Sequence, residues 1–262
     1  MNQLEQNLKV KSLRESEKKC LSNNKELVSV IKRIPHLPLD LDFDLQKINK
    51  EAELVTEYSS HKLHPNKNLP QWYYEHHSNS FRGQCLVDYT PHGTKGMIDS
   101  EGFLFEEPDA QFDDSNKLVF FETPWGAQMP YTLSVLKKIT PYLNRTRLIR
   151  TPPKGGIYWH SHHNGVYQNA YLRLAVIILT LQSNNDCTHG VRDYRDPKSK
   201  AYYKHYEPGT PYLFNSWHDH EFWNHGQTDR LTLICYLNFP DQILLNYLSQ
   251  NIKHYKGELI PE

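Results

Sequence analysis

The strongest constraint on the fold is a run of apolar, largely β-branched residues in the second half of the chain. Residues 172–181 include the segment LAVIILTL, and only Arg173 and Thr180 in this range carry polar side chains. A run of this length and composition is typical of a strand that is covered on both faces, and it is far too short to cross a membrane. We therefore expect residues 172–181 to form a central strand.

Further short segments with strand character surround this run. They alternate apolar with polar residues or are rich in β-branched and aromatic residues, and turns containing Gly, Pro, Asn or Asp separate them. The segments are residues 83–89, 145–150, 211–217 and 231–237. Several short strands divided by turns indicate a β-sandwich or a barrel in the second half of the chain.

Helical periodicity is found mainly in the first half and at the C-terminal end. Apolar residues recur at helical spacing within residues 1–34, and Asp44 is a suitable N-cap for a following helix. Two more helices are expected at residues 131–139 and 241–253. The fold class is thus predicted to be α+β, mainly β. We expect a helical N-terminal extension over residues 1–35 and a single domain over residues 36–262.

The charge balance narrows the possible partners. Lys and Arg total 30 and Asp and Glu total 30, so the formal net charge is zero. This balance argues against bulk nucleic-acid binding, which needs a basic excess, and against docking to anionic lipid. The N-terminal residues are polar, with no apolar signal segment, and the four cysteines form no CxxC pair. These features favour a cytoplasmic protein with reduced thiols.

Histidines are the unusual component. Six of the 15 fall in two short windows, residues 159–164 and 217–225, each at the edge of a predicted strand. Because residues i and i+2 of a strand share a face, His160 and His162 are expected to project together, as are His218 and His220. Imidazole is a good ligand for Fe, Zn, Cu and Ni. Two such clusters on neighbouring strands predict a metal site, and their spacing leaves the metal open.

Arg230 narrows the choice of metal chemistry. It lies ten residues after His220 and opens the predicted strand 231–237. Across a strand–turn–strand hairpin this offset can place the guanidinium behind a metal, where it would bind a carboxylate in a bidentate manner. A metal with an arginine one strand away suits a chelating dicarboxylate. We therefore expect Fe(II), with 2-oxoglutarate as cosubstrate and open positions for it and for O₂.

At these residues the chain resembles the aspartyl/asparaginyl β-hydroxylase family of Fe(II)/2-oxoglutarate oxygenases. The resemblance covers residues 145–239, and the best-matching block runs from residue 220 to residue 231. The family has H-E-V-W there, with R-L beginning ten residues after the histidine, and this chain has H-E-F-W and R-L at the same spacing. The family also has a serine, a turn and a metal-binding histidine six residues beyond the turn glycine. Thr151, Gly156 and His162 keep this order.

The resemblance implies a role for each matching residue. His162 and His220 would be the iron ligands, and Arg230 would hold the far carboxylate of 2-oxoglutarate. The hydroxyl of Thr151 and the guanidinium of Arg173 would be further contacts to the cosubstrate. The fold implied is a double-stranded β-helix (jelly-roll, cupin-like) core at about residues 140–240, with the N-terminal helices packed on it.

The third metal ligand is open. Most iron oxygenases of this kind have an acid two residues after the first histidine, where this chain has Asn164. The family often has glycine there, with water completing the site, so Asn164 is compatible with the resemblance. If His160 were the first ligand instead, His162 would occupy the position of the acid and the site would contain three histidines.

The activity implied is hydroxylation of an unactivated carbon, with Fe(II), 2-oxoglutarate and O₂ as cofactors. The substrate would be an amino acid, a peptide residue or a related small metabolite. The alternatives are a non-catalytic metal- or ligand-binding cupin-like protein, a halogenase of the same superfamily, and a zinc hydrolase with Asp219 or Glu221 as the base.

Candidates for the substrate pocket lie on the same strands. The aromatic candidates are Trp159, Trp217, Trp223 and Tyr236. The candidates to bind a substrate carboxylate are Arg145, Arg147, Arg150, Arg192 and Arg195. The long polar segment 184–206 is predicted to be a lid over the site.

Overall fold

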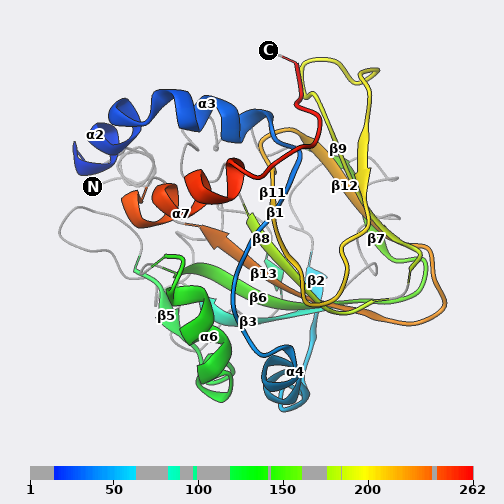
Figure 1. Cartoon of the computed structure of the whole chain (residues 1–262). Helices are drawn as coiled ribbons and strands as arrows, with labels where there is room; N and C mark the ends of the chain where they lie inside the picture. The colour runs from blue at the N-terminus through cyan, green and yellow to red at the C-terminus, as the bar shows by residue number, and fades with distance from the viewer. Residues whose placement is uncertain are drawn as a thin grey trace, which may run out of the picture.

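Two β-sheets that face each other form the body of the protein (Figure 1). The computed structural model describes residues 15–62, 82–88, 97–98, 119–140, 143–160, 176–183, 185–237 and 241–261. All strand pairs are antiparallel except the short parallel pair of β2 with β4. The long-range pairing of both sheets draws mainly on the second half of the chain, as its run of short apolar segments predicts.

The larger sheet has nine strands in the order β1-β11-β8-β13-β6-β3-β2-β4, with β5 paired to β3. These strands are β1 (His36–Pro38), β2 (Ser59–Lys62), β3 (Arg82–Asp88), β4 (Met97–Ile98), β5 (Phe121–Glu122), β6 (Leu143–Thr151), β8 (Val176–Gln182), β11 (Pro211–Phe214) and β13 (Arg230–Leu237). In β8 every residue except the last is buried. This confirms the central strand within its described range, whereas residues 172–175 lie outside the described residues.

The smaller sheet has four strands in the order β10-β9-β12-β7. They are β7 (Gly156–His160), β9 (Cys187–Arg192), β10 (Tyr202–Lys204) and β12 (Asp219–Asn224). Along the chain from β6 to β13 the strands pass between the two sheets, so that β11-β8-β13-β6 faces β10-β9-β12-β7. Eight strands in this arrangement make a jelly roll. The predicted class, mainly β with a double-stranded β-helix core, is confirmed.

The two faces of β13 have different neighbours, and this difference positions the site. Leu231, Leu233, Cys235 and Leu237 belong to the main hydrophobic core together with residues of the helices. The alternate residues, Arg230, Thr232, Ile234 and Tyr236, line a pocket between the sheets. Because side chains of a strand alternate between faces, one strand contributes both to the core and to the wall of the pocket.

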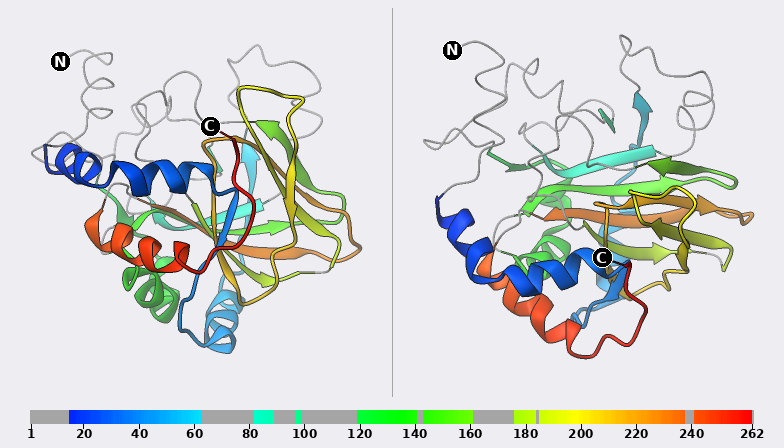
Figure 2. Two further views of the ribbon diagram at one scale, coloured as in Figure 1. Left: turned by 45° about the horizontal axis from the view of Figure 1, so that its top comes forward. Right: turned by 90° about the horizontal axis from the view of Figure 1, so that it is seen from above.

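Helices cover the outer face of the larger sheet. They are α2 (Glu15–Asn23), α3 (Lys25–Arg33), α4 (Leu45–Glu53), α6 (Pro130–Lys137) and α7 (Gln242–Ile252). Figures 1 and 2 show α3 and α7 side by side, and both contribute buried residues to the main core, including Ile31 and Leu245. The N-terminal helices thus pack on the jelly roll as expected. Asp44 is the predicted N-cap, since its carboxylate accepts hydrogen bonds from the backbone N–H groups of Gln46 and Lys47.

The lid predicted over residues 184–206 is wrong. This segment contains β9 and β10, which pair with each other and form half of the smaller sheet. Its polar residues misled the prediction because the outer face of this sheet is polar, while its inner face carries Cys187, His189 and Val191, all buried. Among the described helices, none has the length and apolar content that a bilayer crossing requires.

Candidate functional site

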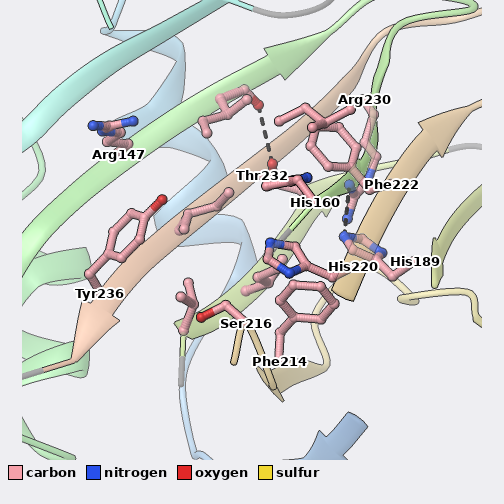
Figure 3. Close-up of a pocket in the computed structure, with 15 residues that line it drawn as sticks. Arg147, His160, His189, Phe214, Ser216, His220, Phe222, Arg230, Thr232 and Tyr236 are labelled. Carbon is pink, nitrogen blue, oxygen red and sulfur yellow. Dashed lines mark hydrogen bonds between the residues drawn. The ribbon is translucent and has the colours of Figure 1, made fainter. Parts of the chain in front are cut away.

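The pocket lies between the two sheets, and the inward-facing side chains of both line it (Figure 3). Its cavity has a volume of about 80 Å³ and is partly open to solvent. Most of the wall is apolar, from residues such as Ile149, Ile178 and Phe214. The polar side chains in the wall include two histidines near the centre, a third histidine, two arginines that approach from different sides, and the hydroxyl groups of Ser216 and Thr232. This contrast of apolar wall and a few polar groups is typical of a small-molecule site.

His160 and His220 face each other across the pair of strands β7 and β12. They are direct partners in the strand register, and their ring centroids are 4.1 Å apart at an angle of 52°. His160 is the last residue of β7, and His220 is the second residue of β12. The pairing therefore comes from backbone register and brings together the two histidine clusters identified in the sequence.

The backbone fixes the tautomer of both rings. His160 Nδ1 lies 2.8 Å from the carbonyl oxygen of Tyr158, and His220 Nδ1 lies 2.8 Å from that of His218. A carbonyl oxygen can only accept, so each Nδ1 carries the proton and donates it. The lone pair of each ring is then on Nε2, which is the arrangement found in metal-binding histidines.

The pair fits a divalent transition metal. With metal–nitrogen distances of about 2.1 Å, two imidazoles bound side by side to one ion have centroids roughly 4–5 Å apart, which agrees with the 4.1 Å observed. Within the described ranges, no group of three or more His, Cys, Asp or Glu side chains could hold a metal ion. A third protein ligand would have to come from outside the described residues, which is where His162 and Asn164 lie.

Arg230 is a buried cation at the start of β13, with only 2% of its surface exposed. Its Nη2 donates to Thr180 Oγ1 at 2.9 Å, and its Nη1 lies 3.4 Å from His189 Nε2. Its Nε is buried without a hydrogen-bond partner. Burial lowers the pKa of Arg230 to about 10, which still leaves it charged at neutral pH. A buried charge that has only neutral partners is costly, so this position is suited to binding an anion.

Thr151 lies directly opposite Arg230 in the pairing of β6 with β13. Directly opposite residues share a face of the sheet, so the threonine side chain lies beside the guanidinium. Its Oγ1 is buried and has no hydrogen-bond partner. The described pocket wall does not include Thr151, which therefore adjoins the Arg230 end rather than the open space. Arg173, the other predicted cosubstrate contact, lies outside the described residues.

His189 is a pocket residue that the sequence reasoning missed. It lies on β9, and its ring stacks on Tyr206 with centroids 4.0 Å apart. Burial, and then the neighbouring Arg230 charge, hold the pKa of His189 well below its usual range. The neutral ring can therefore accept from Arg230 through Nε2 without adding a second charge. The only sign in the sequence that His189 faces inward was its alternation with Cys187 and Val191, which are also buried.

Other predicted site residues have structural partners elsewhere. His218 does not share a face with His220: it precedes β12, and its Nε2 bonds to the carbonyl oxygen of Lys32 at 2.9 Å. Glu221 points to the outer side of β12, where it accepts hydrogen bonds from Tyr203 and Trp223. Of the four aromatic candidates, Tyr236 lines the pocket.

The fold and this pocket define a jelly-roll protein with two facing histidines and a buried arginine. The model of the aspartyl/asparaginyl β-hydroxylase family matches residues 117–240, a range that contains all three residues. The chain thus resembles this family over slightly less than half of its length. No curated protein matches the sequence.

Solved structures with similarity to the chain include three oxygenases. An oxidoreductase of the 2OG-Fe(II) oxygenase family from Burkholderia pseudomallei has 11% identity and a TM-score of 0.45, with 82% of this chain and 90% of that chain covered. A prolyl hydroxylase from Trichoplax adhaerens, solved with a hypoxia inducible factor peptide fragment, has 9% identity and a TM-score of 0.48, with coverage of 94% and 99%. A Pseudomonas putida prolyl-4-hydroxylase has 10% identity and a TM-score of 0.42, with coverage of 82% and 98%.

Proposed function

We propose that this protein is an Fe(II)- and 2-oxoglutarate-dependent oxygenase that hydroxylates an unactivated carbon of an amino acid, a peptide residue or a related small metabolite. The observation that carries the proposal is the presence in one jelly-roll pocket of two facing histidines and a buried arginine with only neutral partners. The family match over residues 117–240 supports the same activity.

The metal would be held by His220 and by a histidine of the first cluster. Spacing from Gly156 favours His162, whereas the strand register places His160 opposite His220. We propose that His160 and His220 bind the iron and that His162 or Asn164 occupies the third position. Glu221, on the outer side of β12, is too far from the pocket interior to act as the base of a zinc hydrolase.

The anion end of the pocket would hold the cosubstrate. Arg230 would bind the far carboxylate of 2-oxoglutarate, and its bonds to Thr180 and His189 orient the guanidinium fork. Thr151 would donate its unpaired hydroxyl to the same carboxylate, and Arg173 would be a further contact. Because His189 is neutral, Arg230 is the charged group that the carboxylate would meet at this end of the described pocket.

The bound iron, with 2-oxoglutarate and O₂, would supply oxidation of a C–H bond together with release of succinate and CO₂. The chain contributes orientation and a dry environment. His160 and His220 keep their Nε2 atoms directed by their backbone hydrogen bonds, and the apolar wall excludes water from the space beside them.

Anaerobic titration tests this proposal. Metal-free protein is given Fe(II) and then 2-oxoglutarate, and the visible charge-transfer band of a chelated 2-oxoacid is recorded. We expect the band in the wild type, its loss in His220→Ala, and a higher 2-oxoglutarate requirement in Arg230→Met. His225→Ala is the matched control, since His225 is exposed on the same segment, and it should keep the band.

Single substitutions of His160 and His162 then identify the first ligand. The band should disappear in His160→Ala and weaken in His162→Ala. A band that survives His160→Ala and disappears in His162→Ala would make His162 the first ligand, as its spacing from Gly156 predicts. Wild-type protein that binds Fe(II) but never gives the band would refute the oxygenase and favour a non-catalytic metal-binding protein. Chlorination of a substrate in the presence of chloride would identify a halogenase.

A further inference from the structure

A second buried arginine in the pocket is unexplained by the proposed cosubstrate. The sequence offered five arginines in this part of the fold as carboxylate binders, and four of them have a carboxylate partner within the protein. These pairs are Arg145–Asp88 at 3.2 Å, Arg150–Asp229 at 3.3 Å, Arg192–Asp219 at 3.3 Å and Arg195–Asp193 at 2.7 Å. Arg147 is the fifth, and no carboxylate in the described part of the chain pairs with it.

Arg147 faces the pocket interior. It is only 2% exposed, and it lines the pocket from β6. Its Nε is buried without a hydrogen-bond partner, and its guanidinium lies 5.8 Å from the centre of the Tyr236 ring. Figure 3 shows Arg147 and Tyr236 together on one side of the pocket, with His220 and His189 toward the other side. An aromatic face offsets only part of the cost of burying a cation.

Arg147 is too far from Arg230 to bind the same small diacid. Arg147 pairs with Ile234 across the strands, four residues along β13 from Arg230. At about 3.3 Å per residue this separates the two backbone positions by about 13 Å along the strand. The side chains do not converge from these positions: Figure 3 shows Arg147 and Arg230 on opposite sides of the pocket. A five-carbon diacid has four carbon–carbon bonds of about 1.5 Å and spans at most about 6 Å. An anion that pairs with the Arg147 guanidinium must therefore belong to a molecule other than 2-oxoglutarate.

We propose that Arg147 binds a negatively charged group of the primary substrate, with the ring of Tyr236 packed against the same part of that molecule. The anion would be fixed on the side of the pocket away from Arg230, and the carbon to be oxidised would be directed toward His160 and His220. This role as a specificity residue rests on the proposed oxygenase function. Anion binding at Arg147 can be measured whether or not that function is correct.

The test compares a carboxylate with its uncharged analogue. Isothermal titration under anaerobic conditions, with Fe(II) and 2-oxoglutarate present, measures binding of 4-fluorobenzoate and 4-fluorobenzamide. We expect the wild type to bind the carboxylate at least about tenfold more tightly, which is the usual effect of one charge-assisted hydrogen bond. Arg147→Met should lose this preference. Arg145→Met removes a neighbouring arginine that already has Asp88 as its partner, and it should keep the preference.

Two results would overturn the inference: a wild type that binds both compounds equally, and an Arg147→Met variant that keeps the preference. The first comparison needs no variant, and Arg147→Lys, which retains the charge, should keep part of the preference even if Arg147→Met does not fold. The charge-transfer band separates this inference from the proposed function. A normal band without an Arg147-dependent preference refutes only the role of Arg147, whereas a preference without any band refutes only the oxygenase.

Discussion

Replacing Arg230 by methionine should stabilise the ligand-free protein while removing its response to 2-oxoglutarate. Burial lowers the pKa of Arg230 from 12.5 to about 10. At about 1.4 kcal/mol per pKa unit, keeping the guanidinium charged costs roughly 3 kcal/mol in the folded protein. Loss of the hydrogen bonds to Thr180 and His189 offsets about 1 kcal/mol of the gain. The net stabilisation expected is about 2 kcal/mol.

Urea and thermal unfolding, with and without 2-oxoglutarate, measure both effects. A gain of about 2 kcal/mol corresponds to a rise in Tm of roughly 4–8 °C for a chain of this size. In the presence of Fe(II) and without O₂, 2-oxoglutarate at about 100 times its Kd should stabilise the wild type by about 2.7 kcal/mol and Arg230→Met very little. Arg150→Met is the control, because that arginine is exposed, pairs with Asp229 and lies over the ring of Tyr58. Its stability should fall by no more than about 1 kcal/mol.

Two results would contradict a role for Arg230 in binding the carboxylate. If Arg230→Met were less stable than the wild type without ligand, Arg230 would be a structural residue whose hydrogen bonds outweigh its burial. If 2-oxoglutarate stabilised the variant as strongly as the wild type, the carboxylate would bind elsewhere.

Three further predictions concern acid stability, strand contact and the outer face of β12. Burial lowers the pKa of His36 from 6.5 to about 4, so on acidification the unfolded chain takes up a proton before the folded protein does. The free energy of unfolding should therefore fall by up to about 3 kcal/mol between pH 6.5 and pH 4. Urea titrations at several pH values should show a smaller pH dependence of this free energy in His36→Gln. An added Cβ at Gly156 would lie 2.3 Å from the carbonyl oxygen of Phe222, so Gly156→Ala should separate β7 from β12 and weaken Fe(II) binding at least about tenfold in equilibrium dialysis. Gly209→Ala is the control, at a position with a φ of +83°. It should lower the free energy of unfolding by roughly 1 kcal/mol and leave Fe(II) binding unchanged. Glu221→Gln should bind Fe(II) with an affinity within about threefold of the wild type, because the Glu221 carboxylate contacts Tyr203 and Trp223 on the outer face of β12. If this variant lost metal binding, Glu221 would be a site residue.

Five strands of the larger sheet, β3, β6, β8, β11 and β13, could be predicted from the sequence because burial leaves a clear apolar pattern in them. The short strands β1, β2, β4 and β5 were not predicted. Residues 231–237 alternate between core leucines and pocket-facing side chains, and all of them are strand-forming. The smaller sheet could not be delimited, since one face carries polar outer residues and the other carries the pocket. β9 illustrates the difficulty: its inner face is made of Cys187, His189 and Val191, which are not recognisable as a hydrophobic face.

The site was predicted in part, and the reason lies in what spacing can encode. The predicted hairpin between His220 and Arg230 is wrong, because β12 and β13 belong to different sheets. The short connection between these strands crosses from one sheet to the other, and both side chains face the pocket that the two sheets enclose. The pairing of His160 with His220 depends on a register between strands 60 residues apart in sequence, which no local pattern fixes. His218 was wrongly grouped with His220 because the strand begins only at Asp219, so the rule that i and i+2 share a face did not apply.

The most direct measurement is the O₂-dependent conversion of 2-oxoglutarate by the iron-loaded protein. We expect the wild type to form succinate and CO₂ in equal amounts, only when Fe(II) and O₂ are both present. His220→Ala should abolish this turnover, and His225→Ala should keep it. A wild-type protein that binds Fe(II) and 2-oxoglutarate but forms no succinate above the metal-only background would contradict the oxygenase.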